Sequence, residues 1–237
     1  MSLITYTSTC THKALIARGV YEFTFAKPHG FTFKPGQFIL FNVPLPENSA
    51  DVQTRAFSIA SSPLEPELLF VAKMVAGGRA SRWMEEVLRV GSPVTFTGAF
   101  GNFVLRASEN DVVFVATGTG MAPFRPMLLE LLRQGDRTID ILFGVKSEED
   151  IFWKNDLDAL TRSFPNVHVA LTLSAPSPSW AGHRGRVQTV LPGIVRNDFS
   201  KKILYVCGNP DMTKEVKELA LHTWGVDKKS LHVEGYI

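Results

Sequence analysis

The chain has 237 residues, a length that suffices for one large domain or two ordinary ones. Of these residues 45% are hydrophobic, and the formal net charge is +2. The near-neutral charge argues against nucleic-acid binding, which needs a clustered basic face, and two cysteines are too few for a zinc or iron–sulfur site, so we expect no metal. No window approaches the ~18 apolar residues of a membrane span and no signal peptide pattern is visible, so we expect a cytoplasmic protein with reduced thiols.

The first half of the chain, up to about Arg106, has the alternating pattern of short β-strands separated by turns. Lys13–Ala17 and Val20–Ala26 flank Arg18-Gly19, which predicts a hairpin. Further strands are expected over residues 37–43, 55–60, 68–75 and 94–97. About six short strands at this spacing predict a small antiparallel barrel or sandwich.

Two features of this half suit a phosphate group. Arg55 lies in the strand segment Arg55-Ala56-Phe57-Ser58, and Gly77-Gly78 precedes a predicted helix over Ser81–Leu88. Taken separately, such features are more often a solvated arginine and an ordinary turn. Together, an arginine and the free N–H groups of a helix start favour a phosphate-bearing ligand.

The run Val112–Ala116 consists of five consecutive apolar residues, which indicates a strand buried on both faces, as in a parallel sheet. Gly118-Thr119-Gly120 follows, and Pro123 suits the first turn of a helix. Apolar residues then recur at helical spacing: Phe124, Met127, Leu128, Leu131 and Leu132. Strand, glycine turn and helix outline a dinucleotide site, although the third glycine of the usual fingerprint is absent and a purely structural turn is an equal alternative.

The remainder of the chain alternates between strand and helix patterns. Strands are expected over residues 138–143, 167–173, 203–206 and 231–234, and helices over residues 148–160, 188–194 and 212–222. This alternation predicts an α/β doubly wound parallel sheet that binds ligands at the carboxyl ends of its strands. The sequence at those ends is Thr117-Gly118, Gly144, Ser174 and Cys207-Gly208.

Seven motifs, in order, resemble those of the ferredoxin–NADP reductase superfamily, and together they run over nearly the whole chain. The motifs are Phe33–Phe38, Arg55–Ser58, Gly78–Ser81, Gly98–Phe103 with Ala99 in place of the usual proline, Gly118–Pro123, Cys207–Met212 and Val233–Ile237. In plant-type members the terminal tyrosine ends the chain, whereas Ile237 follows Tyr236 here. The resemblance implies an antiparallel FAD-binding β-barrel domain over residues 1–108 and an NAD(P)-binding α/β domain over residues 109–237.

The resemblance also implies roles for individual residues. Flavin binding is implied for Arg55, Ala56, Phe57, Ser58, Gly78, Arg79, Ala80, Ser81 and Tyr236. Binding of the nicotinamide nucleotide is implied for Thr117, Gly118, Thr119, Gly120, Pro123, Cys207, Gly208 and Met212. Ser58, Cys207 and Glu234 are the implied catalytic residues, with Ser58 near the flavin N5 and Tyr236 covering the flavin until the nicotinamide displaces it. The plain alternatives are a small buried cysteine, a solvated glutamate and a core tyrosine.

The implied function is that of a flavoprotein oxidoreductase that passes electrons between NADH or NADPH and a separate acceptor through bound FAD. The acceptor is expected to be a ferredoxin, a flavodoxin or an oxygenase component. Alternatives are a reductase of free flavin and a non-catalytic subunit that senses NAD(H). Ser174–Ser177 offers no basic residue for the 2′-phosphate of NADPH, which favours NADH slightly, although Arg184 and Arg186 follow.

Overall fold

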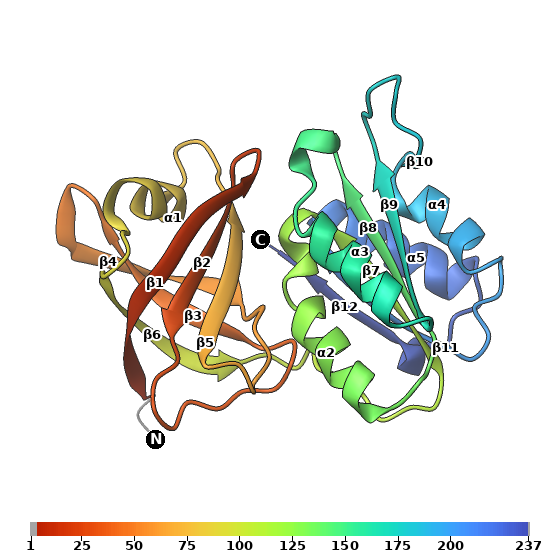
Figure 1. The fold of residues 1–237 in the computed structure, drawn as a ribbon, viewed down its shortest axis with the longest axis horizontal. Coiled ribbons are helices and arrows are strands. Elements are labelled where there is room, and N and C mark those ends of the chain that lie inside the picture. Colours follow the sequence, from red (N-terminus) through yellow and green to blue (C-terminus); the bar gives the residue numbers. More distant parts are fainter. Residues whose placement is uncertain (1–3, 237) are drawn as a thin grey trace. The chain divides into compact units, whose positions relative to one another are not determined.

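The computed structural model describes residues 4–236, so Ile237 lies outside the described residues. This part of the chain forms two compact units (Figure 1). The first unit runs up to Leu105 and also takes in Ala122–Glu130, and the second comprises Arg106–Met121 and the chain from Leu131 onward. The assignment of residues 1–108 to a flavin and of residues 109–237 to a nicotinamide nucleotide stays a prediction.

The first unit is built on a six-stranded antiparallel sheet in the order β4-β3-β6-β1-β2-β5. The strands are β1 (Thr5–Ala17), β2 (Val20–Ala26), β3 (Phe38–Leu45), β4 (Asn48–Ser58), β5 (Glu67–Lys73) and β6 (Pro93–Phe100). The amide of Ala60, just after β4, donates to the carbonyl of Leu69 in β5 at 2.8 Å. This bond joins the two edges of the sheet, and the predicted antiparallel barrel is confirmed.

Aromatic side chains fill the interior of this barrel. Phe23, Phe25, Phe41, Phe70 and Phe96 are each at most 2% exposed. They occupy alternate positions on their strands, as the period of two requires. The ring of Phe41 meets Phe70 edge to face at 5.1 Å and Phe96 at 5.8 Å between centroids, and such pairs add about 1 kcal/mol each beyond the burial of area.

The second strand of the β3–β4 hairpin is longer than predicted. β4 begins at Asn48, whereas the sequence predicts a strand from Arg55. Residues 48–54 are exposed, so they carry no alternation of apolar and polar side chains that a sequence pattern could reveal. Backbone pairing with β3, such as that of Val43 with Gln53, holds this stretch instead.

The helix predicted after Gly78 also differs in detail. α1 (Arg79–Arg82) is a single turn, and a π-helical turn, η1 (Trp83–Val87), follows it. The amide of Leu88 donates to the carbonyl of Trp83 at 2.9 Å and closes this wider turn. Because a π-turn shifts the helical register, Val87 is 41% exposed whereas Trp83 and Leu88 are buried.

The second unit contains a six-stranded parallel sheet in the order β10-β9-β8-β7-β11-β12. The strands are β7 (Asp111–Thr117), β8 (Ile139–Val145), β9 (Val167–Leu173), β10 (His183–Arg184), β11 (Lys202–Gly208) and β12 (Leu231–Gly235). The predicted parallel sheet is confirmed, with the two-residue β10 as an addition. Both of its residues are exposed, so no apolar run marks it.

The helices of the chain from Phe124 onward are α2 (Phe124–Gln134), α3 (Lys154–Ser163), α4 (Val187–Ile194) and α5 (Pro210–His222). α4 and α5 contribute Leu191, Val216 and Ala220 to a core with Val113 and Val206 of the sheet. Alternate residues of β7 and β11 therefore face these helices. Within residues 4–236, no helix combines the length and hydropathy needed to cross a membrane.

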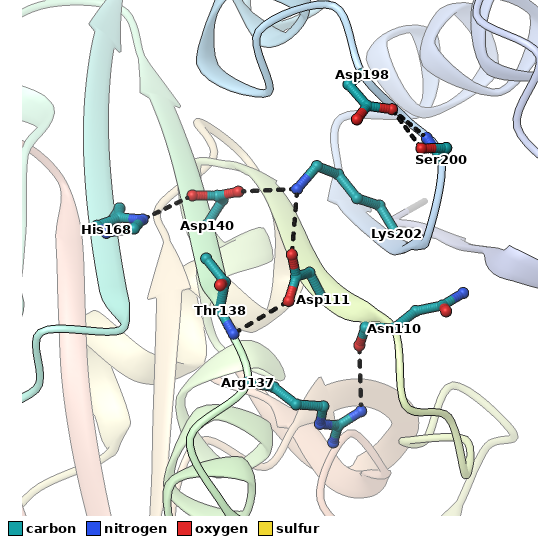
Figure 2. A network of polar contacts seen from close by, with 9 residues as sticks. All are labelled: Asn110, Asp111, Arg137, Thr138, Asp140, His168, Asp198, Ser200 and Lys202. Atoms are coloured by element: carbon teal, nitrogen blue, oxygen red, sulfur yellow. Dashed lines mark hydrogen bonds and ion pairs between the residues drawn. The ribbon is translucent and has the colours of Figure 1, made fainter.

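A charged network joins the amino-terminal ends of four strands of the parallel sheet (Figure 2). Lys202 Nζ lies 3.7 Å from Asp111 Oδ2 and 3.7 Å from Asp140 Oδ2, and His168 Nδ1 lies 3.0 Å from Asp140 Oδ1. The side chains of Lys202 and Asp140 are only 13% and 10% exposed. These contacts fix β7, β8, β9 and β11 at the edge of the sheet opposite to the carboxyl ends.

Replacing Lys202 by methionine is expected to lower the free energy of unfolding by about 3 kcal/mol, because Asp140 is left buried without a counter-charge. Urea unfolding followed by circular dichroism measures the change. Lys217→Met, at an exposed position of α5, is the matched control and is expected to cost less than about 0.5 kcal/mol. Equal stability of the two variants would contradict the stabilising role of the network.

Candidate functional site

The carboxyl ends of β7 and β11 pack closely against each other at two glycines. A Cβ on Gly120 would lie 2.3 Å from the carbonyl oxygen of Cys207, and a Cβ on Gly208 would lie 2.3 Å from Thr117 Oγ1. Neither distance is possible for a side chain, and Gly208 also has a φ of +139°. The amide of Asn209 donates to Thr117 Oγ1 at 3.0 Å. The structure thus brings together the two motifs that the sequence predicts for the nicotinamide nucleotide.

The turn after β7 is tighter than predicted. A 3₁₀ turn, η2 (Gly118–Met121), follows the strand, and α2 begins only at Phe124. Pro123 therefore lies just before the helix rather than within its first turn. The first N–H groups of such a turn have no partner within it, so they suit a pyrophosphate. Gly118 has a φ of +52°, and a Cβ there would meet no atom within 4 Å.

Asn209 is a residue that the predicted site does not include. Its Oδ1 accepts the amides of Asp211 at 2.9 Å and Met212 at 3.2 Å, which caps α5 directly before Pro210. An asparagine followed by a proline is the local signal of such a cap. The side chain of Met212 is 6% exposed and packs in the core between the sheet and α5.

Cys207, Glu234 and Tyr236 lie together beside this turn. The parallel register of β11 and β12 pairs Cys207 with Glu234. The amide of Tyr236 donates to the carbonyl of Gly208 at 3.0 Å, and its hydroxyl donates to the carbonyl of Thr119 at 3.4 Å. Tyr236 therefore spans the end of β11 and the glycine turn.

Burial favours the neutral forms of Cys207 and Glu234 beside this turn. Burial, helped by the charge of Glu234, raises the pKa of the Cys207 thiol far above its usual value, so the thiol is neutral at physiological pH. Burial also raises the pKa of Glu234 to about 7. Glu234 Oε2 is buried without a hydrogen-bond partner among the described residues. The site thus combines a neutral thiol with a carboxyl whose pKa is about 7 and whose Oε2 has no partner among residues 4–236.

In the first unit, the predicted flavin residues of β4 divide between the two faces of the strand. Strand alternation places Arg55 and Phe57 on one face and Ala56 and Ser58 on the other. Arg55 donates from Nη1 to the carbonyl of Thr54 at 2.8 Å and from Nη2 to Gln53 Oε1 at 2.7 Å. Ser58 is 9% exposed, whereas Ala56 is exposed.

The glycine motif before α1 is tied to β4 by an ion pair. Arg79 Nη2 lies 2.9 Å from Asp51 Oδ1, and the Arg79 side chain is 9% exposed. Arg79 Nε is buried without a hydrogen-bond partner in residues 4–236. Ser81 Oγ accepts the amide of Val75 at 2.8 Å, which holds the end of β5 against the helix start. Asp51 is absent from the predicted site because it lies in the exposed, unpredicted part of β4.

The turn at Pro35-Gly36 packs against two other segments of the first unit so closely that position 36 has no room for a side chain. A Cβ on Gly36 would lie 2.0 Å from the carbonyl oxygen of Phe103 and 2.2 Å from Met127 Cε, and Gly36 has a φ of +96°. Arg125, near Met127, forms a two-bond ion pair with Glu65 in which both N–O distances are 2.8 Å. These contacts hold the start of α2 against the barrel.

Comparison with known proteins supports a specific family. Residues 114–218 match the family model described as the oxidoreductase NAD-binding domain. The chain is 36% identical over 227 residues to ferredoxin–NADP reductase B of Sorangium cellulosum, with 92% of this chain and 91% of that protein covered. It is 30% identical over 210 residues to the phenol hydroxylase P5 protein of Acinetobacter pittii, of which it spans only 58% while 86% of this chain is covered.

Two solved structures share the fold over nearly the whole chain. Cytochrome P450 reductase GcoB of Amycolatopsis has a TM-score of 0.88 at 21% identity, covering 99% of this chain and 71% of that one. A ferredoxin NADP+ reductase from Neisseria gonorrhoeae, solved with bound FAD and NADP, has a TM-score of 0.83 at 19% identity and 98% coverage of each chain. Identities this low establish the fold alone.

The raised pKa of Glu234 predicts a specific dependence of stability on pH. Its pKa is about 7 in the folded protein against an ordinary value of 4.5, so the folded state holds a proton that the unfolded chain has lost. Stability is therefore lost as the pH rises from 4.5 through 7. Glu234→Gln removes this loss, and its stability advantage over the wild type is expected to grow by about 2 kcal/mol across that range after solvent screening.

Thermal unfolding of both proteins between about pH 5 and pH 8 measures this difference. Glu218→Gln, on the exposed face of α5, is the control and is expected to follow the wild type. Parallel pH profiles for Glu234→Gln and the wild type would show that the carboxyl has an ordinary pKa.

Proposed function

Because the chain belongs to the ferredoxin–NADP reductase family, we propose that it transfers electrons from NADH or NADPH through bound FAD to a separate acceptor. The chain is an NAD(P)H-dependent oxidoreductase. The observation that carries the proposed function is the close packing of the Gly118–Gly120 turn against Cys207-Gly208, beside Glu234, whose Oε2 has no partner among the described residues. This arrangement combines an anion-binding turn with a partly buried carboxyl whose pKa is raised, which suits a nicotinamide nucleotide.

The residues of the first unit fit the flavin nucleotide. Arg55, Ala56, Phe57, Ser58, Gly78, Arg79, Ala80 and Ser81 are proposed to hold FAD, together with Tyr236. The unpartnered Nε of Arg79 supports this fit, because a buried guanidinium nitrogen without a partner is costly and a phosphate oxygen would satisfy it. The flavin would supply the ability to accept two electrons together and release them singly.

The residues of the second unit fit the nicotinamide nucleotide. Thr117, Gly118, Thr119, Gly120 and Pro123 are proposed to hold its pyrophosphate, and Cys207, Gly208 and Met212 to line its nicotinamide end. The Oε2 atom of Glu234 has no partner in the described chain, and the amide group of a nicotinamide would satisfy it. Tyr236 contacts both Thr119 and Gly208, so we propose that it moves aside when the nucleotide binds.

NADH is the proposed nucleotide, because a basic residue suited to the 2′-phosphate of NADPH is already engaged. Arg184 Nη2 donates to the carbonyls of Ser177, Pro178 and Trp180 at 2.8 to 3.0 Å. The amide of Ser177 donates to Glu148 Oε1 at 3.0 Å, which adds a negative charge at this loop. Both features disfavour a phosphate, whereas a ribose hydroxyl tolerates them.

The proposed acceptor is a separate electron-transfer partner: a ferredoxin, a flavodoxin or an oxygenase component. The names of the two curated relatives support this range, since one is a ferredoxin reductase and the other a phenol hydroxylase protein. A cytoplasmic location is proposed on the unpaired thiols of Cys10 and Cys207. Reduction of free flavin and non-catalytic sensing of NAD(H) are the alternatives that the following test separates.

The flavin-loaded protein is expected to lose its absorbance at about 450 nm when NADH is added without oxygen, and to regain it when an oxidised ferredoxin follows. NADPH at the same concentration is expected to act at least about tenfold more slowly, because Arg184 is engaged. Flavin that washes out on gel filtration would favour the free-flavin reductase. Absence of bleaching in the loaded protein would overturn the proposed function and favour the sensing alternative.

A further inference from the structure

The strand β12 presents two titratable side chains on one face. His232 and Glu234 are two residues apart, so they lie on the same side of the strand with Cα atoms about 6.7 Å apart. The register with β11 pairs His232 with Tyr205 and Glu234 with Cys207. His232 therefore lies on the same face of the sheet as Glu234 and Cys207, two residues closer to the amino-terminal end of β12 than Glu234.

Both side chains leave a buried polar atom unsatisfied. Nε2 of His232 and Oε2 of Glu234 are buried and have no hydrogen-bond partner among residues 4–236. Buried polar atoms in folded proteins are nearly always paired, so two such atoms on one strand face require an explanation. Because the two side chains are neighbours on one face of the strand, a proton can pass between them through a bridging water.

The surroundings of the pair shift the proton affinities of the two groups in opposite directions. Burial raises the pKa of Glu234 to about 7, while burial and the charge of Arg106 lower the pKa of His232 below its ordinary value. In water a histidine holds a proton far more tightly than a glutamate. Here the order is reversed, so Glu234 is the favoured holder of the proton until a positive charge beside it favours its carboxylate.

The other groups that face the pair come from β11 and from the segments before β7 and after β12. Tyr205 of β11 stacks on the His232 ring at 4.9 Å between centroids with an interplanar angle of 28°, and its hydroxyl accepts the amide of Arg106 at 2.8 Å. Cys207 of β11 lies opposite Glu234, and Tyr236 follows β12. Burial raises the pKa of both Tyr205 and Cys207, so neither competes for the proton near neutral pH.

We propose that His232 exchanges a proton with Glu234 and thereby matches the charge of this carboxyl to the oxidation state of the nicotinamide. The proposal rests on the proposed function. The reduced nicotinamide ring is neutral, and the protonated form of Glu234 would match it. Loss of a hydride from C4 to the flavin, which would take both electrons of the C4–H bond, would give the ring one positive charge. The O–H bond of Glu234 then breaks, an N–H bond forms at His232 Nε2, and the carboxylate balances the ring while the protein keeps its proton.

Binding of NAD+ alone tests this exchange, because the oxidised ring already carries the charge. Titration calorimetry of the oxidised, flavin-loaded protein at pH 7, in buffers of different ionisation enthalpy, counts the protons released. Glu234 is half protonated at its pKa of about 7. The wild type is expected to release almost no protons, since His232 accepts what Glu234 loses, and His232→Gln is expected to release about 0.5 per site.

His222→Gln, on the exposed face of α5, is the matched control and is expected to behave as the wild type. The double variant of His232→Gln with Glu234→Gln is expected to release almost none, because the source of the proton is gone. Equal release by the wild type and a folded, NAD+-binding His232→Gln would overturn the exchange and leave the proposed function intact. Absence of any binding heat in the wild type would overturn the proposed function and the exchange with it.

A second measurement covers the case in which His232→Gln does not fold. Nitrogen NMR of the wild type, with labelled histidine, is expected to show His232 becoming protonated when NAD+ is added at pH 7. In Glu234→Gln the same signal is expected to stay neutral. A His232 that stays neutral in the wild type with NAD+ bound would contradict the proposal, and so would protonation that persists in Glu234→Gln, because a merely structural stacking on Tyr205 predicts no such link.

Discussion

The close approach of two stretches of backbone, at the carboxyl ends of β7 and β11, is the constraint on which the rest of the site depends. Gly120 meets the carbonyl of Cys207 and Gly208 meets Thr117 at distances that no side chain allows. Because the two strand ends touch, the glycine turn, Cys207 and the capped start of α5 lie next to one another. The pairing of β11 with β12 then adds Glu234 to the same place.

The two edges of the parallel sheet divide stability and function between them. At the amino ends, Lys202 lies between the carboxylates of Asp111 and Asp140, and His168 contacts Asp140, so the buried carboxylate of Asp140 has two partners. At the carboxyl ends, burial favours the protonated form of Glu234, and its Oε2 has no hydrogen-bond partner among residues 4–236. An unsatisfied buried oxygen costs stability, and the site proposed for the nicotinamide nucleotide carries such an atom.

The sequence predicts the fold well wherever local pattern and tertiary packing agree. The apolar run of β7 and the glycines after it predict a buried parallel strand followed by a turn, and both are observed, whereas binding of a ligand there stays a prediction. The sequence does not predict the exposed start of β4, the π-turn at Trp83 or β10, because no apolar periodicity marks these segments. The contacts of Asp51 with Arg79, and of Glu234 with its strand partner, join residues far apart in the chain, and composition and spacing carry no record of such pairings.

The contact of Gly120 with Cys207 is the central claim, and the affinity for NAD+ of Gly120→Ala tests it most directly. The added methyl group must displace the end of β11, so NAD+ binding measured by calorimetry is expected to weaken at least about tenfold while flavin binding by the first unit is retained. Gly193→Ala, where a Cβ would meet no atom within 4 Å, is the matched control and is expected to keep wild-type affinity. Full NAD+ affinity in a folded Gly120→Ala would contradict the account.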